Sequence, residues 1–182
     1  MNAAASTAGT AEHRLLLTGF PPIERSDARI LILGSMPGAK SLQENQYYAY
    51  RQNLFWPLMG ELFDASPDLP YAERVYRLIE QHVAVWDVLK HCERGGSLDS
   101  AICPASEVVN DFAEFFAMHT EIRAVFLNGR KAEALFRKHA VPSIGPQLDR
   151  VPLHVLPSTS PANAGISPAA KREAWNRVRD WL

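Results

Sequence analysis

The chain lacks several features that would place a protein in a particular class. It has only two cysteines, Cys92 and Cys103, and no neighbouring histidine or cysteine completes a zinc-binding pattern. A typical iron–sulfur cluster needs four cysteine ligands, so no cluster is expected either. Two free thiols in a reducing compartment are the expected state, and we predict neither a metal nor a cofactor.

Long apolar stretches are missing as well. No run approaches the roughly 18 consecutive apolar residues that a membrane-spanning helix needs. The first residues, MNAAASTAGTAEHR, have neither the charged start nor the apolar stretch of a secretory signal. We therefore expect a cytoplasmic protein with no membrane partner. Residues 1–13 should form a disordered leader, and residues 14–182 a single domain.

The small net charge of −1 hides an uneven distribution. Residues 1–120 hold 9 basic and 15 acidic side chains, whereas residues 121–182 hold 10 basic and 5 acidic ones. A basic face that meets phosphates would produce this asymmetry, and so would a solvated basic helix surface. Charge alone therefore does not decide whether the partner is a nucleic acid.

Short apolar runs alternate with segments of helical spacing. Four runs without polar alternation, typical of strands buried on both faces, cover residues 29–33, 83–86, 124–127 and 152–156. Helices are expected over residues 54–62, 71–81, 107–118, 130–139 and 168–181, the last with Ser167 as its N-cap. This alternation predicts a three-layer α/β/α sandwich around a four-stranded, mostly parallel sheet.

Polar or glycine-rich segments follow each predicted strand. In open α/β sheets, ligands bind beyond the carboxyl ends of the strands, so these segments should converge on one site. The first segment, GSMPG (Gly34, Ser35, Met36, Pro37 and Gly38), combines glycines that allow close backbone approach with a proline that fixes the loop shape. It could cradle a phosphate or a carbonyl oxygen, or be a plain turn. It has neither the Rossmann nor the P-loop spacing.

The other strand ends allow two interpretations each. Asp87 could accept a hydrogen bond from the polar edge of a ligand, or serve as a helix cap or salt-bridge partner. Asn128 could face a base edge, or cap the following helix. The loop LPSTSPAN could hold phosphate oxygens, or be a surface turn.

An aromatic segment, QYYAYRQNLFW, follows the first loop. Tyr47 or Tyr48 could stack on a base, with Tyr48 preferred, and Asn53 could position a water molecule. Core packing is the better explanation for Phe55 and Trp56. A serine-nucleophile triad is not expected, because Ser35 is not in a GxSxG elbow and His154, inside a predicted strand, is expected to be a core histidine.

Taken together, these segments resemble the uracil-DNA glycosylase superfamily, and within it the hypoxanthine-DNA (deoxyinosine) glycosylase branch. The resemblance runs from about Thr18 to the C-terminus. It rests on five segments in order: ILILGSMPG, QYY with NLFW, VWDVL with the downstream CxRxGSLD, FLNG and LPSTSPAN.

The resemblance implies a DNA-repair hydrolase that flips a damaged base out of DNA and cleaves its N-glycosidic bond, leaving an abasic site. The deaminated base would be hypoxanthine. The GSMPG loop, Tyr48, Asp87 and Asn128 would form the base pocket. The last motif would grip the DNA backbone and push a wedge into the helix through Ser158, Thr159, Ser160, Pro161, Ala162 and Asn163.

One position departs from the superfamily pattern. Met36 stands where many relatives have the Asp or Asn that activates or positions water, and the hypoxanthine branch shares this loss. The resemblance therefore moves the catalytic role to Asn53. No lysine is clearly suited to a Schiff base, which implies a monofunctional enzyme, and a monomer is expected. Uracil or xanthine specificity, a catalytically silent DNA-binding relative and a small-molecule nucleotide hydrolase are the alternatives.

Overall fold

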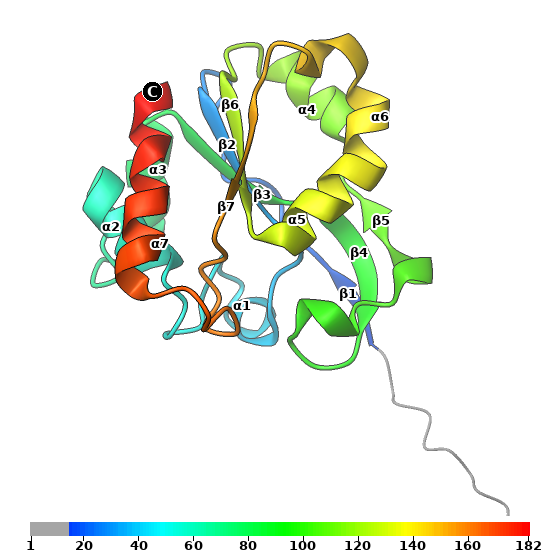
Figure 1. Ribbon diagram of the computed structural model, residues 1–182, viewed down its shortest axis with the longest axis horizontal. Coiled ribbons are helices and arrows are strands. Elements are labelled where there is room, and N and C mark those ends of the chain that lie inside the picture. The colour runs from blue at the N-terminus through cyan, green and yellow to red at the C-terminus, as the bar shows by residue number, and fades with distance from the viewer. Residues whose placement is uncertain (1–14) are drawn as a thin grey trace, which may run out of the picture.

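The computed structural model describes residues 15–182, so the expected leader lies outside the described residues. At its centre is a four-stranded sheet in the order β3-β2-β6-β7 (Figure 1). The strands are β2 (Ile30–Gly34), β3 (Val83–Asp87), β6 (Ala124–Asn128) and β7 (Leu153–Leu156). All neighbouring pairs are parallel, so the predicted sheet is confirmed and has no antiparallel member.

Helices cover both faces of this sheet, which confirms the three-layer sandwich (Figure 1). One face carries α2 (Phe55–Phe63), α3 (Tyr71–Glu80) and α7 (Pro168–Asn176). The other carries α4 (Phe112–Met118), α5 (Arg130–Leu135) and α6 (Val141–Ile144). Every residue of β2 and β3 is buried between these layers, which explains why their sequences are apolar without alternation. The short helix α1 (Ala39–Glu44) follows the first loop.

A second, smaller sheet was not predicted. It is antiparallel in the order β1-β4-β5 and consists of β1 (Leu15–Thr18), β4 (Leu89–Arg94) and β5 (Val108–Val109). Only Val88 separates β4 from β3, so the chain passes directly from the large sheet into the small one. The mixed sequence of β4, LKHCER, has no continuous apolar run, and pairing with its neighbours stabilises it as a strand.

The start of one predicted helix is wrong. The helix expected over residues 107–118 begins at Phe112, because the two β-branched valines before it pair with β4 instead. Asp111 then caps the helix, its carboxylate accepting a hydrogen bond from the main-chain N–H of Glu114 (2.9 Å).

Two further helices differ from expectation in length. The helix expected over 130–139 continues from α5 through a π-helical segment, Phe136–Ala140, into α6. The last helix becomes a 3-10 helix after Asn176. The Ser167 hydroxyl accepts a hydrogen bond from a first-turn N–H (3.2 Å), so its predicted role as N-cap is confirmed. Within residues 15–182, four 3-10 segments lie at Asp99–Ala101 (η1), Pro104–Ser106, Gly145–Leu148 and Arg177–Trp181.

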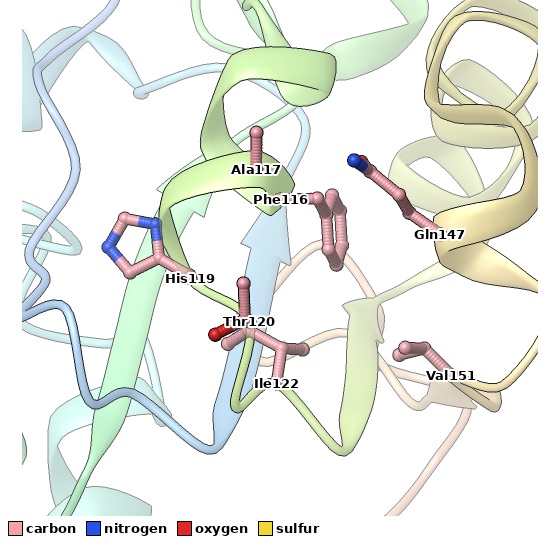
Figure 2. Close-up of a pocket in the computed structure, with 7 residues that line it drawn as sticks. All are labelled: Phe116, Ala117, His119, Thr120, Ile122, Gln147 and Val151. Carbon is pink, nitrogen blue, oxygen red and sulfur yellow. The ribbon is translucent and has the colours of Figure 1, made fainter.

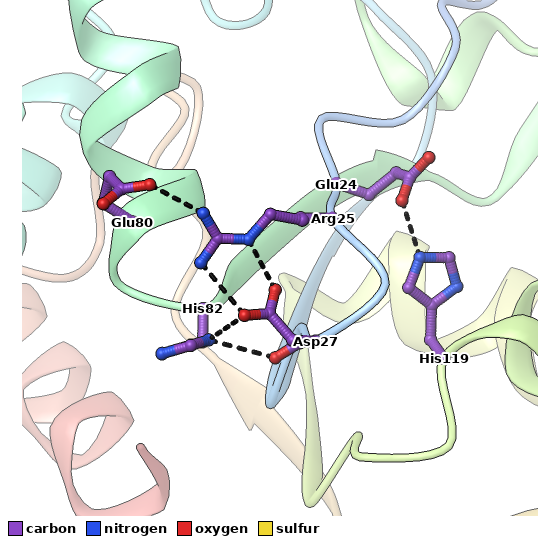
Figure 3. A network of polar contacts seen from close by, with 6 residues as sticks. All are labelled: Glu24, Arg25, Asp27, Glu80, His82 and His119. Atoms are coloured by element: carbon purple, nitrogen blue, oxygen red, sulfur yellow. Dashed lines mark hydrogen bonds and ion pairs between the residues drawn. The ribbon is translucent and has the colours of Figure 1, made fainter.

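The amino end of the large sheet is tied together by charged side chains (Figure 3). Arg25 bonds to both Asp27 (2.6 Å) and Glu80 (2.6 Å), and His119 bonds to Glu24 (2.7 Å). The Arg25 pairs are well exposed to solvent, so each adds little to the free energy of unfolding. They join the segment before β2 to the end of α3.

A small cavity of about 310 Å³ also lies at this end of the fold (Figure 2). Its lining residues are Phe116, Ala117, His119, Thr120, Ile122, Gln147 and Val151. Both ring nitrogens of His119 already have partners, namely the Phe115 carbonyl (2.8 Å) and Glu24. No carboxylate lines this cavity, and neither ring nitrogen of His119 is free to bind a ligand.

Candidate active site

A much larger cavity, of about 990 Å³, lies at the carboxyl ends of the four parallel strands. The strands end together because their register is parallel, with Gly34 of β2 opposite Asp87 of β3. All residues that the sequence assigned to the site line this cavity. They are Gly34, Ser35, Met36, Pro37, Gly38, Tyr48, Asn53, Asp87, Asn128, Ser158, Thr159, Ser160, Pro161, Ala162 and Asn163.

The first loop must begin with glycine. A Cβ atom on Gly34 would collide with the Asp87 carboxylate and would lie only 2.8 Å from the Tyr48 hydroxyl oxygen. The backbone thus approaches two cavity side chains more closely than any other residue type permits. Arg94 holds the far side of the loop, donating a hydrogen bond to the Pro37 carbonyl (2.7 Å).

Asp87 is buried, with an exposed fraction of 3%, and one carboxyl oxygen, Oδ2, has no hydrogen-bond partner among residues 15–182. Its main-chain carbonyl accepts a hydrogen bond from the Asn110 amide (2.8 Å), which fixes the strand end. Burial and the nearby Asp99 carboxyl raise the pKa of Asp87 to about 8, against the opposing charge of Arg94. Neither the helix-cap nor the ion-pair interpretation accounts for this side chain.

Asn128 acts as a strut between three parts of the site. Its amide nitrogen donates to the Tyr48 hydroxyl (3.2 Å) and to the Thr159 hydroxyl (3.0 Å), and its amide oxygen accepts from the Thr159 N–H (2.9 Å). It makes no capping bond to α5, whose N-cap is Gly129. Because both amide hydrogens are engaged, Asn128 supports the pocket wall rather than offering a free donor.

Tyr48 stacks on the aromatic core. Its ring lies 3.9 Å from that of Phe55, centroid to centroid, at 17° between the planes. Its backbone φ of 53° is unusual for a residue with a side chain, and the contacts with Phe55 and Asn128 hold it there. The structure thus fixes an aromatic ring in the wall of the cavity.

Asn53 stands at the entrance to α2. Its side-chain oxygen accepts a hydrogen bond from the Phe55 N–H (3.0 Å), which fixes the side-chain orientation. The next residue, Leu54, donates its N–H to the Thr159 carbonyl (3.0 Å). The catalytic candidate from the sequence is therefore tied to the last loop of the cavity.

The last loop is stiffened by its own hydroxyls. Ser158 and Ser160 each accept a hydrogen bond from the N–H two residues later, at 3.2 Å, and Thr159 is almost wholly buried. Lys171 of α7 donates to the Ser160 carbonyl (3.3 Å). Exposed Pro161 lies near the tip of a loop that is held rigidly behind it.

The sequence did not predict the apolar side chains around the mouth of the cavity. Tyr50, Leu98 and Ile166 line the cavity, yet 48%, 58% and 39% of their respective surfaces are exposed. Large apolar side chains left exposed at the mouth of a cavity indicate a contact surface. Only the three-dimensional arrangement reveals it, because the three come from separate loops.

A second acid, the half-buried Asp99, was also missed. It lines the cavity from η1, and its carboxylate accepts a hydrogen bond from the Ser35 hydroxyl (2.7 Å). The sequence contained it only as the last residue of the CxRxGSLD segment. Among residues 15–182, no group of three or more His, Cys, Asp or Glu side chains is positioned to hold a metal ion.

A parallel α/β sheet whose strand ends enclose a partly apolar cavity with a buried acid is typical of the α/β proteins that bind ligands at this edge of the sheet. Residues 21–179 match the model of the uracil DNA glycosylase superfamily, and the chain belongs to that family. No helix among residues 15–182 is long and apolar enough to cross a membrane.

Named relatives and a solved structure agree with this membership. The chain is 33% identical over 171 residues to a hypoxanthine DNA glycosylase of Methanosarcina acetivorans, covering 92% of this chain and 96% of the relative. A hypoxanthine DNA glycosylase of Methanosarcina barkeri is 35% identical over 115 residues, 63% of this chain and 72% of the relative. The solution NMR structure of a candidate uracil DNA glycosylase from M. acetivorans superposes with a TM-score of 0.70 at 31% identity, covering 91% of this chain and 99% of that one.

Proposed function

We propose that this protein is a monofunctional DNA glycosylase that removes hypoxanthine from DNA by hydrolysing the N-glycosidic bond, leaving an abasic site. The observation that carries the proposal is the likeness to two relatives named hypoxanthine DNA glycosylase, one of them along nearly its whole length. The cavity supports it with a fixed aromatic ring and a buried acid at the strand ends.

A base inside a duplex is out of reach of a cavity this deep, so the nucleotide must first be flipped out. Hypoxanthine pairs poorly opposite thymine, which lowers the cost of flipping. In our proposal the serine hydroxyls and main-chain amides of the last loop hold phosphates, and Pro161 or Ala162 enters the gap in the duplex. The exposed Leu98 and Ile166 also line the cavity and add apolar surface at its mouth.

In the cavity, the flipped base would lie against the Tyr48 ring and the GSMPG loop, with Asp87 at its polar edge. Asn53 would orient the attacking water, because an amide cannot act as a strong base and must work by positioning. Its bond to the Phe55 N–H leaves the amide hydrogens without a partner among residues 15–182.

The proposal is tested with labelled duplexes that contain a single deoxyinosine, uracil or xanthine, followed by alkaline cleavage of abasic sites. We expect cleavage of the deoxyinosine duplex. Release from uracil alone would contradict the specificity. DNA binding without cleavage of any duplex would identify a silent binder, and turnover of free nucleotides alone would identify a nucleotide hydrolase.

Asn53 is tested in the same assay. Asn53→Ala should lower the single-turnover rate at least about 100-fold while DNA affinity stays close to wild type. Asn176→Ala is the matched control, since the Asn176 side chain is exposed and does not line the cavity. A wild-type rate in Asn53→Ala would refute its catalytic role. We further propose a monomer located in the cytoplasm, which sedimentation and cell fractionation would test.

A further inference from the structure

Two carboxyl groups line the cavity, the buried Asp87 and the half-buried Asp99, and the function proposed above uses only the first. Asp87 ends β3 with Oδ2 unpaired among the described residues, and Asp99 lies on η1 with its carboxylate bonded to Ser35. Two carboxyl groups that face one cavity do not both ionise readily, because their charges repel each other.

Their surroundings place the proton on Asp87. Burial also raises the pKa of Asp99, but the hydrogen bond from Ser35 and the charges of Arg94 and Lys131 limit this rise. For Asp87, burial and the charge of Asp99 act in the same direction, and only Arg94 opposes them. The two environments therefore separate the pair into a neutral acid and a carboxylate.

The other titratable groups facing Asp87 do not reverse this assignment. Arg94 donates a hydrogen bond from Nη2 to the Pro37 carbonyl (2.7 Å) and one from Nε to the Gly96 carbonyl (3.0 Å). It makes no hydrogen bond to Asp87. The Tyr47 and Tyr48 hydroxyls also stand near Asp87. Burial, and then the Asp87 carboxyl, raise the pKa of both phenols, so both stay neutral.

We propose that Asp87 is a catalytic acid that protonates the departing purine, and that Asp99 is a positioning residue that keeps Asp87 in its acid form. The inference rests on the proposed function, because it concerns the same base and the same bond. It assigns Asp99 a role and changes that of Asp87 from hydrogen-bond acceptor to proton donor.

The step balances as follows. The bond between C1′ of the sugar and N9 of the purine breaks, and its electron pair passes into the purine ring. The proton on Asp87 Oδ2 moves to a ring nitrogen of the purine, so the base leaves as a neutral molecule. The water oxygen bonds to C1′ and sheds one proton to solvent, from which Asp87 is reprotonated. Purines carry an acceptor nitrogen, N7, that pyrimidines lack, which favours hypoxanthine over uracil.

The experiment measures single-turnover excision of hypoxanthine between pH 5 and pH 10 for the wild type, Asp99→Asn, Asp99→Glu and Asp87→Asn. For the wild type we expect a plateau at low pH and a tenfold fall per pH unit above about 8, where Asp87 loses its proton. Asp99→Asn removes the neighbouring charge and should move this fall about one pH unit lower. Asp99→Glu should return the fall in rate to its wild-type pH. Asp87→Asn should abolish this pH dependence together with most of the activity.

Asp149→Asn, at an exposed aspartate outside the cavity, is the matched control and should leave the profile unchanged. A merely structural role for Asp99 would lower the rate equally at every pH, and that result would overturn the inference. A wild-type rate that increases from pH 7 to 9 would also overturn it. If the wild type excises no hypoxanthine at any pH, the proposed function itself fails, which separates the two outcomes.

Discussion

Replacing Asn128 by alanine tests the geometry of the site most sharply. The change removes three hydrogen bonds, one to Tyr48 and two to Thr159. The Thr159 residue is almost wholly buried. At about 1 kcal/mol net for each bond, the free energy of unfolding should fall by about 3 kcal/mol. In urea this corresponds to a midpoint lower by about 1–2 M.

The same substitution should lower hypoxanthine excision. Without the strut, the Tyr48 ring and the last loop lose their fixed positions, and a displacement of about 1 Å at an active site can cost about 100-fold in rate. Urea unfolding followed by fluorescence gives the first quantity, and single-turnover excision gives the second. Asn163→Ala, which removes only one longer bond to the Ser158 carbonyl (3.3 Å), is the control for stability and should cost about 1 kcal/mol or less.

Two results would refute this reasoning about Asn128. A variant with the wild-type urea midpoint but no excision would show that the amide acts on the substrate and not as a strut. A variant that keeps both the midpoint and the rate would show that the three bonds contribute nothing.

Further predictions concern the cavity wall and its rim. Gly34→Ala should lower stability by about 1–3 kcal/mol and nearly abolish excision, since the new methyl group collides with the Asp87 carboxylate. Gly165→Ala is the control, because a Cβ atom there meets open space, and it should change neither thermal unfolding nor excision. Equal losses of stability and excision in both variants would show that the collision with Asp87 is not the cause. Leu98→Ala and Ile166→Ala should each slow excision from duplex more than from single-stranded DNA, and equal slowing on both substrates would exclude a wedge.

The sequence was sufficient to predict the four-stranded sheet and the convergence of the strand-end segments on one cavity. Runs such as 29–33 and 124–127 are apolar throughout because both faces of the central sheet are covered, and that pattern is visible in one dimension. Parallel strands bring their carboxyl ends to the same edge, so Gly34, Asp87 and Asn128 were expected to converge, and they line one cavity.

The second sheet and the finer roles could not be predicted. The strand β4 has a mixed sequence, and its pairing depends on segments distant in the chain. The place of Asn128 as a strut depends on Thr159, 31 residues away, and no local pattern encodes that contact. Likewise the proximity of Asp99 to Asp87 arises from the turn after β4, and the pKa of Asp87 depends on it.

The central claim, that this cavity releases hypoxanthine from DNA, is tested most directly by identifying the released product. A duplex with one deoxyinosine opposite thymine is incubated with the wild-type protein. The released small molecules are separated from the DNA, then identified and quantified by mass spectrometry. The account predicts free hypoxanthine in equal amount to the abasic sites formed, and almost none with Asn53→Ala. No free base, or release of uracil but not hypoxanthine from matched duplexes, would contradict it.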